Sequence, residues 1–291
     1  MRAETVPSAV VGIASSSRTR VLEFDGIIDQ VREARQACER FPEIAREFDI
    51  TRGDWIGRQF YDWSQVEAAA SGSWPEGMAT LTKLLDELSK AQLPEPKVIR
   101  RRGRWSEDTG AEINLDRYRE AEPYWWNIQR TPVHGSRVVT MLVQVTGDAS
   151  QTCEQMTWKG ALAIALARII EDAGYRAEII AFNISMGSYG DNANSFWSVP
   201  IKAASDAIDM GTLVNVISGW YFRTVGFGSF VIGGAVELGE GLGYPGYPSA
   251  KTVERLIGPG GKAWMLDDVW SFSQAVAKAK KLIPTLNQLD V

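Results

Sequence analysis

Two different patterns of apolar and polar residues divide the chain near residue 135. Before that point, apolar residues recur every three or four positions over residues 24–40 and 78–93, and this spacing predicts amphipathic helices. A shorter helix is expected over residues 64–70. Together these patterns predict a smaller, mainly helical N-terminal region over residues 1–93.

The segment over residues 94–135 has a different character. Pro94 and Pro96 end the preceding helix. A basic run is followed by an acidic stretch and then by an aromatic stretch at residues 118–126. We interpret this segment as a connector whose aromatic side chains pack against its neighbours. The basic run consists of Lys97, Arg100, Arg101, Arg102 and Arg104.

From residue 136 onward, short apolar runs alternate with helical patterns. Residues 138–145 are almost continuously apolar, as expected for a strand that is covered on both faces. The alternation predicts an α/β domain over residues 136–291, with a doubly wound, mostly parallel sheet. The expected strands are residues 138–145, 176–182, 196–201, 227–236 and 263–266, and the expected helices are residues 153–173, 211–219, 252–257 and 271–282.

The loop over residues 145–150 follows the first of these strands. In doubly wound sheets the ligand site lies at the carboxyl ends of the strands, near the point where the strand order reverses. We therefore expect a functional site in this loop. A purely structural alternative is that Asp148 or Ser150 caps the helix that follows.

Several of these segments follow one another in an order that resembles a von Willebrand A (vWA) domain. The likeness is carried by VVTMLV at residues 138–143, AGYRAEI at residues 173–179, IKA at residues 201–203 and MGT at residues 210–212. More narrowly, residues 110–285 resemble the C-terminal vWA part of CobT-like subunits. The resemblance implies a vWA/Rossmann-like fold. It also implies a partner, the hexameric MoxR/CobS-type AAA+ ATPase with which such subunits work, as in cobalt chelatase.

The metal-binding positions of the vWA family are only partly kept. Such a site uses an Asp-x-Ser-x-Ser loop, a threonine from a second loop and an aspartate from a third, and their oxygens bind Mg²⁺. A neutral amide binds a hard dication more weakly than a carboxylate does, so the resemblance implies a degenerate metal site. In this chain Gln144 replaces the leading aspartate, Thr146 and Asp148 stand at the serine positions, Thr212 matches the threonine, and the last aspartate falls near Gly233.

We expect this degenerate site to lack a metal ion and to bind a protein partner instead. Mg²⁺ held by Thr146, Asp148 and Thr212 is the less favoured alternative, and no other cofactor is expected. The expected partner-binding surface consists of Gln144, Thr146, Asp148, Ser150 and Thr212.

Composition adds a few limits. A net charge of −5 over 291 residues gives no global electrostatic argument for binding nucleic acid or a membrane. Two cysteines do not make a disulfide framework, so we expect a reducing, cytoplasmic location. The single histidine, His134, argues against a zinc site of the Cys/His type. No apolar run reaches the length of a membrane span.

The leading hypothesis is a non-enzymatic protein-interaction module, an adaptor or co-subunit of an AAA+ ATPase. A nucleic-acid-binding protein that uses the basic run over residues 97–104 is an alternative. A structural or assembly protein, including a phage protein, is another, because residues 55–58 and 74–77 resemble uncharacterised proteins of phages and bacteria. No nucleophile–base pair is evident, so an enzyme is the least supported class.

Overall fold

A mixed sheet forms the centre of the molecule. The computed structural model describes residues 1–7, 18–45, 50–51, 53–72, 74–89, 102–106, 112–129, 138–147, 150–186, 194–232, 244–246 and 248–290. Within these residues the sheet has seven strands, in the order β1-β2-β8-β7-β6-β10, with β9 paired to β7. The strands are β1 (Arg2–Pro7), β2 (Arg18–Glu23), β6 (Val138–Gln144), β7 (Arg176–Met186), β8 (Asn194–Lys202), β9 (Tyr244–Pro245) and β10 (Ala263–Leu266).

Parallel and antiparallel pairs are equally common in this sheet. The pairs β2–β8, β6–β7 and β6–β10 are parallel, whereas β1–β2, β7–β8 and β7–β9 are antiparallel. The α/β class is therefore confirmed, but the sheet is mixed and not mostly parallel. One cause is that β8, the next strand after β7 in the chain, pairs with β7 antiparallel, whereas the parallel pair β6–β7 is joined through the helix α7.

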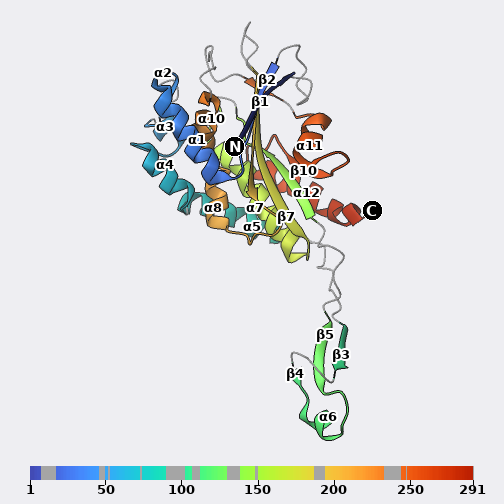
Figure 1. Cartoon of the computed structure of the whole chain (residues 1–291). Coiled ribbons are helices and arrows are strands. Elements are labelled where there is room, and N and C mark those ends of the chain that lie inside the picture. Colours follow the sequence, from blue (N-terminus) through green and yellow to red (C-terminus); the bar gives the residue numbers. More distant parts are fainter. Residues whose placement is uncertain are drawn as a thin grey trace.

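The helices gather mainly on one face of this sheet (Figure 1). Val139, Met141 and Val143 of β6 point into that core, whereas Leu142 points to the opposite face. The helices of the first face are α1 (Ile27–Arg40), α2 (Pro42–Ala45), α3 (Gly53–Ile56), α4 (Trp63–Ala70), α5 (Pro75–Ser89), α7 (Cys153–Asp172), α8 (Met210–Val216), α9 (Gly219–Tyr221), the π-helix η2 (Phe222–Gly226), α10 (Phe227–Val231) and α12 (Phe272–Leu282), which continues into the 3₁₀-helix η3 (Ile283–Asp290).

One described helix, α11 (Ala250–Ile257), covers the opposite face. Its apolar side chains pack on the core residues Leu142, Phe182 and Phe196. Arg255 of α11 also forms ion pairs with Glu4 and Glu23, at 2.5 and 2.7 Å, and so joins this helix to β1 and β2. The two layers of helices that a doubly wound sheet implies are therefore very unequal here.

The N-terminal region shares this core. It contributes β1 and β2, and β2 pairs in parallel with β8. Gln30 of α1 is fully buried, where it donates a hydrogen bond to Ser229 and accepts one from Tyr221, both at 3.1 Å. Residues 1–93 were expected to form a separate helical region, but two of their segments are strands of the main sheet.

The prediction of a strand over residues 227–236 is wrong. Phe227–Val231 is the helix α10, and residues 233–236 lie outside the described part. Residues 213–230 are buried without interruption. In such a sequence a buried helix and a buried strand leave the same apolar pattern. The strands that lie beside β6 are β7 and β10.

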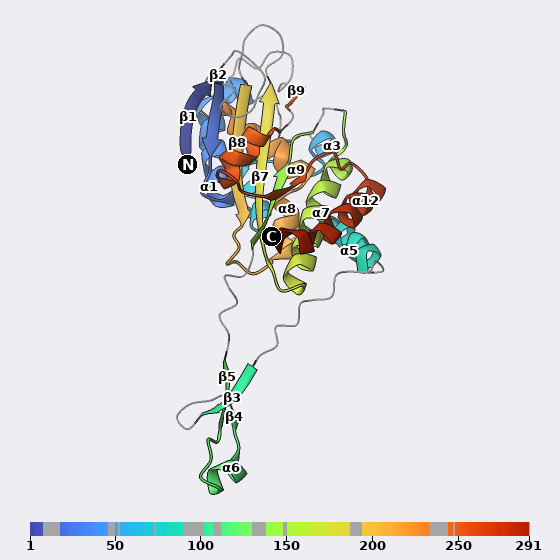
Figure 2. The ribbon, with the colours of Figure 1, turned by 90° about the vertical axis from the view of Figure 1, so that its right-hand side faces the viewer.

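The expected connector contains a small sheet of its own, which we call the projecting sheet. It comprises β3 (Arg102–Ser106), β4 (Glu112–Ile113) and β5 (Trp125–Gln129), with the short helix α6 (Leu115–Arg119) at its far end. Figures 1 and 2 show it apart from the main body. Arg102 and Arg104 of the basic run lie on β3, where Arg104 pairs with Asn127, whereas residues 97–101 lie outside the described part.

The other predicted helices and strands are confirmed to within a few residues. The strands over residues 138–145, 176–182, 196–201 and 263–266 correspond to β6, β7, β8 and β10, and the four helices predicted after residue 136 correspond to α7, α8, α11 and α12. Among the described residues, no helix combines the length and the hydropathy that crossing a membrane would require.

Candidate functional site

The carboxyl end of β6 is the point where the strand order reverses. From β6 the chain runs through α7 to β7 on one side, while β10 lies on the other side, and both neighbours are parallel to β6. Ligand sites of open α/β sheets lie outside this kind of strand end. Figure 2 shows β7 pointing away from the projecting sheet, so the strand ends face the opposite side of the molecule.

A buried lysine of α7 lies beneath this strand end. The ammonium of Lys159 donates hydrogen bonds to the carbonyl oxygens of Gln144, at 2.6 Å, and Thr146, at 3.3 Å. The ring of Trp270 covers the ammonium, with the nitrogen 4.0 Å from the ring centroid. Only 3% of Lys159 is exposed, so the group is removed from water. Lys159 therefore ties the end of β6 to the segment between β10 and α12.

The electrostatics of Lys159 are unusual. Burial lowers the pKa of its ammonium from 10.5 to about 7, although Asp268 and Asp267 raise it in part. Asp267 is itself paired with Lys278, at 2.8 Å. Among the described residues, Lys159 forms no ion pair within 4.0 Å. Its charge is thus held by carbonyl dipoles and an aromatic ring, and it lies close to neutralisation at physiological pH.

Side-chain hydrogen bonds extend this network to β7 and β9. The Thr146 hydroxyl donates to the side-chain oxygen of Asn183 on β7, and the Gln144 amide donates to the carbonyl of Gly246, which follows β9. Asn183 is fully buried, and its amide nitrogen has no hydrogen-bond partner among the described residues. The end of β6 is therefore fixed to β7 and to the residue that follows β9.

A second buried cation holds the other end of the loop. Arg223 of the π-helix donates to the carbonyls of Trp55 and Gln151, and its guanidinium lies 4.7 Å from the Trp55 ring centroid. It also lies 3.5 Å from the sulfur of Cys153. Burial raises the pKa of this thiol despite Arg223, so Cys153 is not an activated nucleophile. Arg223 serves to anchor the loop against the helix layer.

The helix after the loop begins with a capping box. Thr152 is the N-cap of α7, where its hydroxyl accepts from the backbone of Gln155 and the Gln155 side chain accepts from the Thr152 amide. Ser150 does not serve as the N-cap, because it lies in the turn two residues earlier. Asp148 lies outside the described residues.

The structure brings together only part of the predicted surface. Gln144 and Thr146 are neighbours, but they are 7% and 6% exposed and point into the network. Ser150 is exposed beside them. Thr212 lies elsewhere, near the start of α8, where its hydroxyl donates to Asp209. In this part of the chain, the residue that lies against the start of α7, and so near the carboxyl end of β6, is Gly219. It follows α8 and contacts Cys153.

These residues do not fit a bound Mg²⁺ ion. The Thr146 hydroxyl and the Gln144 carbonyl already have partners, and a positively charged ammonium lies against the same carbonyl. In the described part of the chain, no three Asp, Glu, His or Cys side chains group as metal ligands would. The last aspartate was expected near Gly233, outside the described residues. Asp267, the carboxylate that follows β10 beside β6, pairs with Lys278.

Three residues that build this site were missed in the sequence. Lys159 is the one charged residue within residues 156–167 of helix α7, and this interruption of an apolar run is a usable signal. Asn183 similarly interrupts the apolar strand β7. Arg223 is likewise the one charged residue among the buried residues 213–230, but its place in the site depends on the π-helix, which the sequence did not indicate.

Comparison with known proteins places the whole core in one family. Residues 16–286 match a family that is described as a domain of unknown function, DUF7192. No curated protein matches the chain. No solved structure matches it either. The match runs from β2 to the 3₁₀-helix η3, so it includes the N-terminal region and the sheet alike. The chain therefore belongs to the DUF7192 family.

Proposed function

We propose that this protein is a non-enzymatic interaction module that presents the carboxyl end of its sheet to a protein partner. One observation carries the proposal: buried groups hold the loop after β6 from inside, with Lys159 at one end and Arg223 at the other. Burying two cations costs free energy, and an ordinary surface loop does not need such support. Such an arrangement supports a loop whose shape matters to another molecule.

The residues that can touch a partner are the exposed ones at this end. They are polar, and two of them are acidic. We name them the strand-end surface: Ser150, Thr152, Glu154, Gln155 and Asp268. Gln144 and Thr146 belong beneath this surface, where they shape it, and Thr212 does not contribute to it.

We propose further that the fold is vWA-like and that the partner is a MoxR/CobS-type AAA+ ATPase. The parallel unit β6–α7–β7, with β10 on the far side of β6, supports a vWA/Rossmann-like arrangement around the strand end. The sequence resemblance to CobT-like subunits supports the choice of partner.

A binding experiment with two matched serine variants tests this proposal. The chain and a MoxR/CobS-type ATPase from the same host are mixed with a slowly hydrolysed ATP analogue and analysed by size-exclusion chromatography. Ser150→Arg places a large side chain on the strand-end surface, and we expect it to weaken the complex at least tenfold. Ser205→Arg makes the same change at an exposed site after β8, at the other end of the sheet, and should leave the complex intact. Equal binding by both variants would rule out the strand-end surface, and no complex at all would rule out the ATPase.

The projecting sheet favours a second candidate function, nucleic-acid binding. Two arginines of the basic run, Arg102 and Arg104, lie on β3, away from the main body. Binding of this kind weakens steeply with salt, because phosphate contacts release counterions. Replacing Arg100, Arg101 and Arg102 with Ala should abolish the binding of a labelled single strand, measured by fluorescence anisotropy. Arg119→Ala, at an exposed residue of α6, is the control and should bind normally.

A further inference from the structure

The strand end already contains a cation, and that cation belongs to the chain. An ammonium has three N–H donors. At Lys159 two of them reach the carbonyls of Gln144 and Thr146, and the Trp270 ring covers the group on a further side. We infer that the Lys159 ammonium is the resident cation of this site, in place of a metal ion, and that it fixes the end of β6, at Gln144 and Thr146, to the segment that carries Trp270. The inference rests on the proposed function in one respect: the strand-end surface that Lys159 supports is the proposed binding surface.

The positive charge of this ammonium disfavours a metal ion beside it. A dication within a few ångströms of Lys159 would meet strong repulsion in a site that water does not screen. The Gln144 carbonyl is the closest oxygen to the ammonium, at 2.6 Å, and it would have to change partners. Asp267, the first carboxylate after β10, is already paired with Lys278. The chain thus supplies internally the positive charge that such a strand end would otherwise take from solution.

Burial lowers the pKa of Lys159 more than the surrounding charges raise it. Asp267 and Asp268 face it from the turn after β10 and favour the charged form, while Lys278 of α12 opposes it. Desolvation outweighs these charges, and the pKa of about 7 supports exchange of the proton near neutrality. Asp267 is divided between two lysines, so the positive charge of Lys159 is only partly compensated.

Loss of the proton weakens the attachment of the loop without removing it. The neutral amine keeps two N–H donors for the two carbonyls, but a charge-assisted hydrogen bond is roughly twice as strong as a neutral one. The attraction to the face of Trp270 also depends on the charge. The loop is therefore held more tightly below the pKa of Lys159 than above it.

Fluorine NMR on the unmodified sequence tests the proton step. The protein is labelled with 5-fluorotryptophan, and the Trp270 signal is assigned with Trp270→Phe. We expect the chemical shift of Trp270 to titrate with a midpoint near pH 7. The buried Trp197 and Trp220 provide internal controls that should not move. A flat Trp270 signal across this range would overturn the inference.

Two variants separate Lys159 from the other groups that titrate near neutrality. Lys159→Met should abolish the titration of Trp270. His134→Gln removes the single histidine of the chain and should leave the titration unchanged. Persistence of the titration in Lys159→Met, or its loss in His134→Gln, would contradict the assignment to Lys159. The wild-type titration itself requires no variant, so the inference stays testable if Lys159→Met does not fold.

Mg²⁺ alone tests the other half of the inference. Addition of millimolar Mg²⁺, or of a chelator, should change neither the Trp270 signal nor the melting temperature. A saturable shift with Mg²⁺ that Thr146→Val removes would show a metal site and would overturn the inference. These measurements use the isolated chain, so their outcome is independent of whether the ATPase binds.

Discussion

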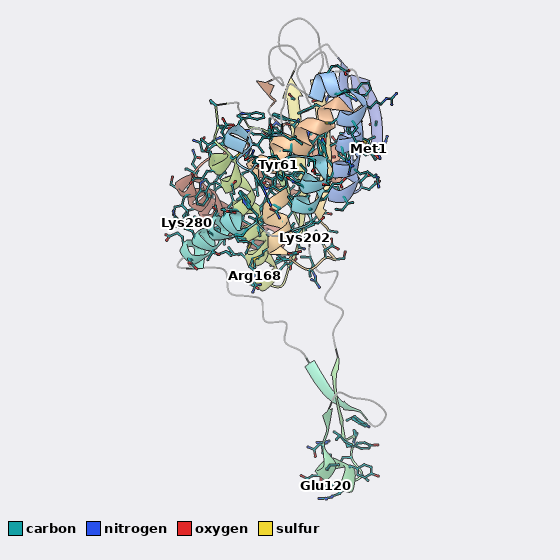
Figure 3. The ribbon with its side chains drawn as sticks, turned by 90° about the vertical axis from the view of Figure 1, so that its left-hand side faces the viewer. Met1, Tyr61, Glu120, Arg168, Lys202 and Lys280 are labelled. Carbon is teal, nitrogen blue, oxygen red and sulfur yellow. The ribbon has the colours of Figure 1, made fainter. Side chains whose placement is uncertain are left out.

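Two buried lysines lie at opposite ends of the same sheet, and their surroundings differ. Lys202, at the end of β8, has a side chain that is 1% exposed, and its ammonium lies 2.7 Å from Glu171, in an ion pair whose angle falls outside hydrogen-bond geometry. It also donates to the carbonyl of Ala177, at 2.8 Å. Lys159, at the end of β6, has carbonyls and an aromatic ring but no ion pair among the described residues. Figure 3 shows Lys202 at the end of the body nearer the projecting sheet.

The difference separates a structural lysine from one with a second purpose. A buried charge that has a carboxylate partner is neutralised on the spot, and its role is to join two elements, here α7 and β8. A buried charge without one raises the energy of the native state, and this is the kind of local conflict that occurs at functional sites. The comparison therefore points to the strand end at β6, and not to the opposite end of the sheet.

The largest expected effect is on stability when Lys202 is replaced. Lys202→Met leaves Glu171 without its partner, and because Glu171 is 19% exposed, we expect a loss of about 2–4 kcal/mol. Lys159→Met also removes hydrogen bonds from two carbonyls, but it relieves the burial of an unpaired charge. Its loss at neutral pH should be smaller, about 0–1 kcal/mol. Urea unfolding of both variants measures the difference, and equal losses would remove the distinction between the two lysines.

The pH dependence of stability is the next largest effect. The pKa of Lys159 is lowered to about 7 in the folded state, against 10.5 for an unperturbed lysine. Between these values the unfolded chain binds more protons, so stability rises with pH, by at most about 1.4 kcal/mol for each pH unit. Burial raises the pKa of the Cys38 thiol to about 12, which lowers stability at the alkaline end.

The difference between wild type and Lys159→Met isolates the lysine, because Cys38 contributes equally to both. Unfolding free energies are compared between about pH 6 and about pH 9. The wild type should gain stability relative to the variant as the pH rises above about 7. A constant difference over this range would show that Lys159 keeps an ordinary pKa.

A third prediction concerns the aromatic cover of Lys159. Trp270→Leu removes the ring 4.0 Å from the ammonium, and we expect a loss of about 1–2 kcal/mol at pH 6, where Lys159 is charged. The loss should shrink at pH 9, where the amine is neutral. Phe272→Leu is the control, because its ring lies 5.0 Å from Lys83, which is exposed, and its effect should not depend on pH. Melting temperatures at the two pH values provide the measurement.

The sequence predicts the elements of this fold better than their arrangement. Helix α7 and strand β6 follow directly from apolar runs of suitable length, and both are confirmed. The direction of β8 is not encoded in its apolar pattern, so a mixed sheet was not foreseen. The strands β1 and β2 were missed because β2 lies far in sequence from its partner β8, and β1 joins the sheet through β2. Residues 227–231 were assigned to a strand because apolar content alone does not distinguish two buried elements.

The sequence placed the loop after β6 at a strand end, but it did not show which groups hold that strand end. The loop after β6 was placed at the strand end because the carboxyl ends of β strands form the site in sheets of this kind. Alignment of Gln144 and Thr146 with metal ligands suggested that their oxygens point outward, whereas both side chains are buried. The group that decides the chemistry, Lys159, lies 13 residues after Thr146 on another element, and only the packing of α7 against β6 brings them together. A short sequence motif does not show contacts between side chains that belong to different elements.

The smallest predicted effect sharpens the comparison within the strand end itself. Asp268 has a positive φ of 44°, a left-handed conformation that Asp and Asn tolerate better than most residues. Asp268→Asn therefore keeps the backbone and removes only the charge that raises the pKa of Lys159. We expect the titration midpoint of Trp270 to move to lower pH, and stability at about pH 6 to fall by less than about 1 kcal/mol, with no change at about pH 9. Asp206→Asn, beside Lys202, changes an exposed carboxylate that accepts from the backbone of Ala203, and it should not move that midpoint. A shift to higher pH in Asp268→Asn would mean that Asp268 does not face the ammonium, and the charge of Lys159 would then be held by carbonyls and the ring alone.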